Sequence, residues 1–268
     1  MQVQLDQFIQ DVARESGAIL KDRFHHVSKW RTKTSRGDVV TEVDEASENL
    51  ILSRIREHFP DDSILSEESG KAVSGSTDRL WIIDPLDGTR NYLMQVPFFC
   101  VSIGVAREGK PYAGGIYDPI HDELFFAERK RGAYLNGEPI SVSKESSLED
   151  SVVSVSWVRQ KVQRRRFVEY IQHISKDTSY FRRFGSAALV MAYVACGRLH
   201  AYLQGGLNPW DVAAGVTLIE EAGGQVTNFE GSELDVENPE IEIVTANPNL
   251  HSLLVNDVIG KQSALRQR

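Results

Sequence analysis

The chain has 268 residues, of which 41% are hydrophobic and 25% charged, and these are ordinary values for a globular protein with a large core. Its 38 acidic and 30 basic residues give a net charge of −8. This charge argues against nucleic acid as the main partner, because binding a phosphate backbone needs a dense basic surface. Because residues 1–24 carry charges throughout and no run of 18 apolar residues occurs, we expect neither a signal peptide nor a membrane span and predict a cytoplasmic protein.

The first part of the chain predicts two helices and a short strand. Residues 4–24 place apolar side chains at helical spacing, and a second helix is predicted over 43–59, where Pro60 ends it. The polar, Gly-containing residues between them, 32–41, predict a loop or a hairpin. A short strand is expected at 63–65.

The middle of the chain changes to short apolar runs with a period of two. An apolar run at 80–83 predicts a buried strand that ends in a tight acidic turn. Turns containing Gly, Pro or Asn then separate the strands of an expected antiparallel meander. These strands are predicted at 99–106, 112–117, 123–128 and 133–135.

The last part of the chain mixes helices and strands. Strands are predicted at 151–156, 181–184, just after 223–224, and 241–246, and helices at 162–175, 185–199, 210–222 and 249–265. We expect one domain over residues 1–268, made of two α/β halves with a seam near 145–150. Such a pattern favours layers of helices and mixed sheets.

The acidic turn after residue 83 carries the strongest chemical signal. Asp84 and Asp87 stand three residues apart in the sequence D-P-L-D-G-T. A single Asp at the end of a strand is usually a turn or cap residue. Two carboxylates delivered into one tight turn are typical of a site that holds a hard cation against a phosphate.

Other acids extend this signal. Glu67 and Glu68 follow a predicted strand, Asp44 opens the second helix, and Asp211 stands at the start of a later one. Taken singly, Asp44 and Asp211 could be helix N-caps and the two glutamates solvent-exposed loop residues. Their joint occurrence with the acidic turn favours a shared site.

The two cysteines do not belong to this predicted acidic site. Cys100 and Cys196 lie in or beside apolar runs, and their spacing fits no zinc motif. We interpret them as free, buried thiols in a reducing compartment.

The segments 38–44, 67–69, 81–91, 185–188 and 208–215 follow one another over almost the whole chain, and they include the motifs D-P-x-D-G-T and W-D-x-A-A-G. In this order they resemble the inositol monophosphatase family, which belongs to a superfamily of magnesium-dependent, lithium-sensitive phosphatases. The two motifs are together highly specific for the superfamily, but much less specific for the substrate.

The resemblance implies a layered α-β-α-β-α sandwich of the sugar and inositol phosphatase type, with two or three Mg²⁺ ions. Glu67, Asp84 and the Leu86 carbonyl would hold one ion, and Asp84, Asp87 and Asp211 the second. The residues agree independently, because all the ligands are oxygen donors and no His or Cys clusters with them.

The resemblance also implies catalytic roles for Glu67, Thr89 and Asp44. The Thr89 hydroxyl would pass a hydrogen bond between the attacking water and Asp44. Backbone N–H groups of Gly88 and Thr89, at a predicted helix start, would cradle the phosphate. The alternative for Thr89 is a simple N-cap.

Substrate contacts follow from the same resemblance. The implied contacts are Asp87, Gly88, Thr89, Arg183, Gly185, Ser186, Ala187, Gln204 and Asp211. Gln204 stands where inositol phosphatases carry a Glu that binds inositol hydroxyls, and an amide lacks that charge. Arg183 could instead contact a dimer partner or be an exposed strand charge. Lys33, with residues 33–38, matches a segment that approaches the metals in relatives, and Arg90 has no assigned role.

These observations predict a Mg²⁺-dependent phosphomonoesterase with inositol 1-phosphate as the leading substrate. Alternatives within the superfamily are phosphatases for fructose 1,6-bisphosphate, histidinol phosphate or 3′-phosphoadenosine 5′-phosphate. An alternative of another class is a regulatory binding protein on the same fold, for example in a transcription complex, although intact metal ligands argue against it. The resemblance further implies a homodimer.

Overall fold

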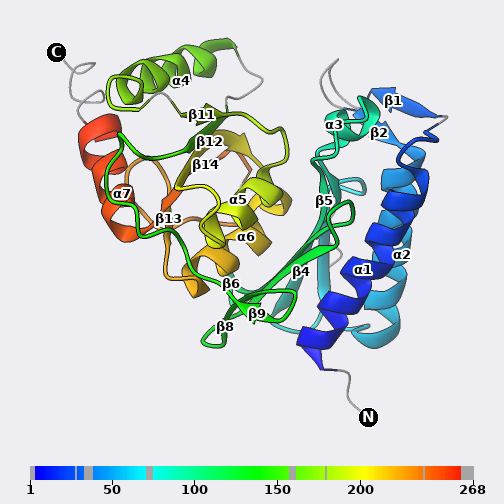
Figure 1. The fold of residues 1–268 in the computed structure, drawn as a ribbon. Helices are drawn as coiled ribbons and strands as arrows, with labels where there is room; N and C mark the ends of the chain where they lie inside the picture. The colour runs from blue at the N-terminus through cyan, green and yellow to red at the C-terminus, as the bar shows by residue number, and fades with distance from the viewer. Residues whose placement is uncertain are drawn as a thin grey trace.

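Helices and sheets alternate in five layers (Figure 1). The computed structural model describes residues 4–27, 29–32, 39–70, 75–156, 161–178, 180–237 and 239–260. The helices are α1 (Leu5–Arg23), α2 (Glu42–His58), α3 (Thr89–Leu93), α4 (Lys161–Ile174), α5 (Ala187–Ala195), α6 (Pro209–Glu221), α7 (Pro248–Leu253) and the π-helix η1 (Leu254–Gly260). Figure 1 shows α1 and α2 on one outer face, α5 and α6 between the two large sheets, and α4 and α7 on the other outer face. The predicted α-β-α-β-α layering is confirmed.

The first large sheet has seven strands in the order β3-β4-β5-β6-β7-β8-β9. They are β3 (Ser63–Ser66), β4 (Arg79–Asp87), β5 (Cys100–Arg107), β6 (Lys110–Asp118), β7 (Glu123–Glu128), β8 (Gly132–Leu135) and β9 (Glu138–Pro139). Only the β3–β4 pair is parallel. From β4 to β9 each strand pairs antiparallel with the next, which confirms the predicted meander.

The second large sheet has five strands in the order β11-β10-β12-β14-β13. They are β10 (Val153–Ser156), β11 (Phe181–Arg182), β12 (Ala201–Leu207), β13 (Gln225–Thr227) and β14 (Ile241–Ala246). β10 is parallel to β11 and to β12, whereas β14 is antiparallel to its neighbours. The sequence analysis missed β12, because Gly205 and Gly206 lie in it and its register shifts between Gln204 and Leu207.

Side chains of β4 alternate between two apolar clusters. Trp81 and Ile83 pack with α1 and α2, while Ile82 packs on the opposite face with α5 and α6. All three are fully buried. The strand that leads into the acidic segment is therefore fixed from both sides.

Helix α6 lies unusually close to the first sheet. A Cβ atom on Gly104 of β5 would lie 2.7 Å from Ala213 of α6, and one on Gly114 of β6 would lie 2.6 Å from Ala214. Any larger residue at these strand positions would push the helix away. These two glycines thus set the distance between α6 and the sheet, and with it the position of the start of α6.

A few elements differ from the predictions. β1 (Trp30–Thr32) pairs antiparallel with β2 (Val39–Thr41), which confirms the hairpin alternative, although its connection lies outside the described residues. The predicted closing helix becomes α7 followed by the π-helical turns of η1. Cys100 is a buried free thiol as predicted, but Cys196 is only partly buried.

Candidate metal and phosphate site

Asp84 and Asp87 reach the same face of the first sheet because β4 contains an extra residue between them. Residues three apart in a regular strand point to opposite faces. Here Asp84 lies opposite Ser102 and Asp87 opposite Cys100, so three steps on β4 match two steps on β5. Pro85, which has no N–H to donate, is tolerated at such a β-bulge. The predicted tight turn is therefore a bulge inside a strand that continues to Asp87.

Two buried serines hold this bulge from behind. The Ser47 hydroxyl on α2 donates a hydrogen bond to the Pro85 carbonyl at 2.8 Å, and it lies 2.5 Å from the Ser16 hydroxyl on α1. Both serines are fully buried. Because an unpaired buried carbonyl costs about 1–3 kcal/mol, this polar chain stabilises the irregular backbone.

The third acid, Asp211, comes from the first turn of α6. Its Oδ2 atom accepts a hydrogen bond from the Asn208 N–H at 2.6 Å. Asn208 is the N-cap of α6, just as Thr41 is the N-cap of α2, where Asp44 is the third helical residue. The N-cap alternative for Asp44 and Asp211 is therefore wrong, and each acid instead hydrogen-bonds back to the N-cap residue of its helix.

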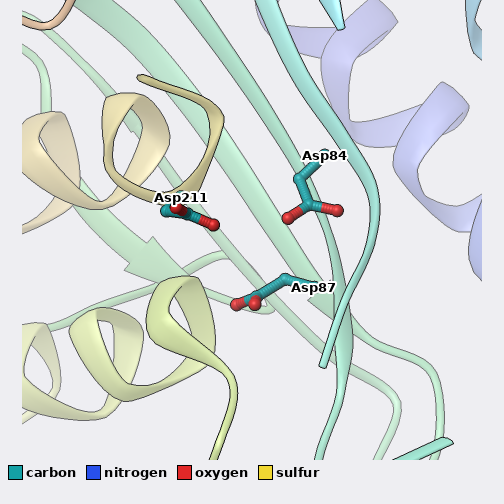
Figure 2. Close-up of side chains that lie close together, drawn as sticks. All are labelled: Asp84, Asp87 and Asp211. Atoms are coloured by element: carbon teal, nitrogen blue, oxygen red, sulfur yellow. The ribbon is translucent and has the colours of Figure 1, made fainter. Parts of the chain in front are cut away.

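Asp84, Asp87 and Asp211 form an acid cluster at the junction of β4 and α6. One carboxylate oxygen of each lies within 4.8 Å of the others, and Figure 2 shows the three side chains turned toward the same region. Asp84 and Asp87 are 1% and 7% exposed. Burial, followed by the charges of Glu67, Asp87 and Asp211, raises the pKa of Asp84 well above its ordinary value. Such a cluster requires protons or a cation.

Glu67 lies beside this acid cluster. It directly follows β3, and its N–H donates a hydrogen bond to the Ile83 carbonyl at 3.1 Å. Its charge contributes to the raised pKa of Asp84 and of Asp87. The parallel β3–β4 pair thus brings the end of β3 next to the acids of β4.

Thr89 links the bulge to Asp44. Its hydroxyl lies 3.2 Å from Oδ1 of Asp44 and 3.1 Å from the Leu86 carbonyl oxygen. The other carboxylate oxygen of Asp44 accepts hydrogen bonds from the backbone N–H and the hydroxyl of Thr41. Burial raises the pKa of Asp44 to about 6. Asp44 is thus a buried carboxylate with a raised pKa that lies within hydrogen-bond distance of the Thr89 hydroxyl.

Asp87 is held by the start of α5. Its Oδ2 atom accepts hydrogen bonds from the Ser186 hydroxyl and the Ala188 N–H, both at 2.6 Å. The Cys100 thiol lies 3.9 Å from the same oxygen. Burial raises the pKa of Asp87 to about 6, although the bonds from Ser186 and the α5 backbone oppose that rise. The structure shows that Ser186, which the family resemblance predicts as a substrate contact, orients Asp87.

The backbone between Asp87 and α3 leaves no room for a side chain. Gly88 has a φ of 97°, and a Cβ atom there would lie 3.1 Å from the Phe98 carbonyl and 3.2 Å from Ser186. The Asn91 amide donates to the Phe98 and Phe184 carbonyls, at 2.7 Å each. These contacts join α3 to the loop that carries Gly185 and Ser186, just before Ala187 opens α5.

Ser156, Arg183 and Gln204 form a group that we call the donor rim. Ser156 ends β10 and pairs in register with Gln204 on β12, and Arg183 directly follows β11. The Arg183 Nε–H donates to the Ser156 hydroxyl at 3.4 Å. The hydroxyl of Tyr202, which is 1% exposed, donates to Oε1 of Gln204.

Some expected residues are not placed, and some contributors were missed. Lys33 and the rest of 33–38 lie outside the described residues, and Arg90 is exposed. The sequence analysis missed Thr41, Asn208, Ser47 and Tyr202. A Thr or Asn three residues before each helical Asp could have revealed the first two. The Ser47 hydroxyl bonds to Pro85, which is distant in sequence, and the Tyr202 hydroxyl bonds to the Gln204 side chain. No local sequence pattern indicates either contact.

The five layers and the acid cluster are those of a metal-dependent phosphatase. The chain belongs to the inositol monophosphatase family, whose family model matches residues 1–262. It is 35% identical over 260 residues to the inositol-1-monophosphatase of Bacillus subtilis, covering 96% of this chain and 97% of that protein. It is 38% identical over 263 residues to Nus factor SuhB of Xylella fastidiosa, covering 93% of this chain and 94% of that protein.

A solved structure supports the same assignment. The inositol monophosphate-bound form of SaIMPase-II superposes with a TM-score of 0.82 at 32% identity, covering 98% of each chain. The predicted family, fold and phosphatase class are thus confirmed. Within the described part of the chain, no helix is both long and apolar enough to cross a membrane.

Proposed function

We propose that this phosphatase uses Mg²⁺ to hydrolyse a small polyol or sugar phosphate, with inositol 1-phosphate as the first candidate. The observation that supports this proposal most directly is the acid cluster, in which two buried carboxylates and one partly buried carboxylate each place an oxygen within 4.8 Å of the others. Phosphate monoesters hydrolyse extremely slowly in water, so their catalysis requires strong charge neutralisation. A site with this negative charge would repel a phosphate unless cations were present.

The residues of the site fit Mg²⁺. Asp84, Asp87 and Asp211 would hold one ion, and Glu67, Asp84 and the Leu86 carbonyl another. All are oxygen donors, which Mg²⁺ prefers over nitrogen or sulfur. When bound, Mg²⁺ supplies positive charge that lowers the pKa of a water and steadies the phosphate and the leaving alkoxide.

The protein supplies the proton path. The Thr89 hydroxyl, 3.2 Å from Asp44, would accept a hydrogen bond from the attacking water and donate its own proton toward Asp44. A pKa of about 6 leaves Asp44 ionised at pH 7 but basic enough to share that proton. The N–H groups of Gly88, the N-cap of α3, and of Thr89, its first residue, would orient the phosphate.

A substrate panel with phosphate release as the readout tests the proposal. Activity should disappear in excess chelator and return with Mg²⁺. Ca²⁺ should inhibit because its longer and looser coordination misplaces the water. Li⁺ inhibition is expected from the family resemblance. Full activity in excess chelator would rule the mechanism out.

The alternatives remain separable by the same panel. Fructose 1,6-bisphosphate, histidinol phosphate and 3′-phosphoadenosine 5′-phosphate belong in it. A regulatory binding role has one observation in its favour, the relative named Nus factor SuhB. Absence of phosphate release from every substrate at saturating Mg²⁺ would favour that role. We also propose a cytoplasmic homodimer, whose mass light scattering can measure.

A further inference from the structure

The Ser102 hydroxyl is a buried polar group that has no hydrogen-bond partner in the described part of the chain. Ser102 lies within β5 and is 1% exposed. Most buried side-chain hydroxyls in proteins are hydrogen-bonded to the protein itself or to an ordered water, and an unpaired one can mark the place of a water or an ion. The residues around Ser102 indicate which group it would bind.

Ser102 lies on the face of the first sheet that also carries the acid cluster. Side chains two residues apart along a strand share a face of the sheet, so Ser102 shares its face with Cys100 and Gly104. Cys100 packs in the apolar cluster around α5 and α6, and its thiol lies 3.9 Å from Oδ2 of Asp87. A Cβ atom on Gly104 would lie 2.7 Å from Ala213 of α6. The Ser102 side chain therefore points into the closed layer between β5 and α6.

Asp84 is the acceptor within reach of Ser102. The two residues stand directly opposite each other in the antiparallel pair of β4 and β5. Cβ atoms of such a pair are about 4.5–5.5 Å apart, so a change of one rotamer can bring the serine oxygen to the carboxylate. On its other side Ser102 stands opposite Ile116 of β6, which has no polar side-chain atom. Of the two side chains opposite Ser102, only the Asp84 carboxylate can accept a hydrogen bond.

The Asp84 carboxylate needs donors that hold it in place. Its Oδ1 atom accepts a hydrogen bond from the Leu86 N–H at 3.0 Å. One of its oxygens also lies within 4.8 Å of carboxylate oxygens of Asp87 and Asp211. Carboxylates that ligate a metal are usually hydrogen-bonded in turn, and these outer partners strengthen metal binding. The buried hydroxyl of Ser102 is suited to this task from within the sheet.

We propose that Ser102 is a positioning residue for the cation site, and that its hydroxyl turns to donate a hydrogen bond to Asp84 when a cation is bound. This inference rests on the proposed function, because it requires Asp84 to be a metal ligand. Ser102 then has two effects of opposite sign. It lowers the stability of the metal-free protein, in which its buried hydroxyl is unpaired, and it raises the affinity for the cation. A residue that only fills space would not combine these effects.

Ser102→Ala measures both effects without a substrate. Mn²⁺ is the probe, because it prefers the same oxygen donors as Mg²⁺ and its free form is measured directly by electron paramagnetic resonance. The dissociation constant for Mn²⁺ should rise by about 10-fold, the lower end of the range for losing an outer hydrogen bond to a metal ligand. In excess chelator, the melting temperature should rise by about 2–4 °C, because the variant lacks the unpaired buried hydroxyl.

Ser154→Ala is the matched control. Ser154 lies on β10 of the second sheet, is also 1% exposed, and its hydroxyl likewise has no partner among the described residues. This variant should raise the melting temperature in chelator by a similar amount and leave the dissociation constant for Mn²⁺ unchanged.

The outcomes separate the role of Ser102 from the proposed function. Wild-type protein that binds no Mn²⁺ would contradict the proposed cation site, and the role of Ser102 with it. Normal Mn²⁺ binding by wild type with an unchanged dissociation constant in Ser102→Ala would overturn the role of Ser102 and leave the proposed function intact. A fall in the melting temperature of Ser102→Ala in chelator would overturn that role in the same way.

Discussion

The acid cluster and the donor rim differ in how firmly they are held. Asp84 and Asp87 are 1% and 7% exposed, and each accepts hydrogen bonds from groups fixed in the fold. Arg183 is exposed and Gln204 only half-buried. Groups that would act on the phosphate are thus built into the layers, whereas groups that would meet the rest of the substrate stand at a solvent-facing edge. Chemistry and specificity can therefore change independently.

The largest expected effect lies in the acid cluster. Asp87→Asn or Asp211→Asn should lower turnover by at least about 10²-fold, because each removes a charge that stabilises the transition state. The fold should survive, since the change also removes repulsion between buried acids. Steady-state kinetics measures the loss, with the exposed Asp177→Asn as control. Turnover within a few-fold of wild type would show that these acids are not metal ligands.

Substituting Thr89 should have the second largest effect on turnover. Thr89→Ala removes the hydroxyl that lies 3.2 Å from Asp44 and should lower kcat by about 10²-fold, the lower end of the range for general acid–base catalysis. Thr89→Ser keeps the hydroxyl and should recover most of kcat. Equal losses in both variants would point to packing instead of proton transfer.

Ser186 tests how the acid cluster is supported. Ser186→Ala removes a 2.6 Å hydrogen bond to Asp87 and a cap of α5, so the Mg²⁺ concentration for half-maximal activity should rise by about 10-fold. Ser186→Thr retains the hydroxyl and is the matched variant. A fall in stability without any change in Mg²⁺ dependence would limit Ser186 to its capping role.

The smallest effect concerns pH and the metal-free protein. The folded-state pKa of Asp87 is raised to about 6, so between its ordinary value of 3.8 and 6 the folded protein binds more protons than the unfolded chain. This carboxyl therefore makes the metal-free protein less stable as the pH rises through that window. In excess chelator, the melting temperature of Asp87→Asn should rise relative to that of wild type as the pH goes from 4 to 6. The rise should be about 2–4 °C for each kcal/mol of difference in the free energy of unfolding. A difference independent of pH would contradict the shifted pKa.

The sequence predicted the type of most elements, because periodicity is a local property. It also predicted which acids meet, since the family motifs name Asp84, Asp87 and Asp211. It did not predict β12, where two glycines weaken the strand pattern. Nor did it predict the bulge in β4, because an extra residue is defined only by the pairing of that strand with β5.

The predicted substrate contacts, Gln204 and Arg183, were harder to interpret from the sequence for a different reason. Residue types alone identified Gln204 as a departure from the family. What Gln204 could bind depends on whether its amide oxygen or its NH₂ group faces a ligand. The hydrogen bond from the Tyr202 hydroxyl to the amide oxygen sets that orientation. Similarly, the position of the Arg183 side chain depends on its contact with Ser156, the last residue of β10. Specificity at this edge would depend on side-chain orientation, which a sequence motif does not show.

The bulge in β4 has a consequence for how this segment tolerates insertions and deletions. It releases backbone groups from the ladder: the Pro85 carbonyl accepts from Ser47, the Leu86 N–H donates to Asp84, and the Leu86 carbonyl oxygen lies 3.1 Å from the Thr89 hydroxyl. Deleting Leu86 would restore regular pairing and leave both acids on one face, yet the Leu86 N–H and carbonyl would be lost. Despite its loop-like composition, the segment should therefore accept a change of side chain at residue 86 more readily than a change of length.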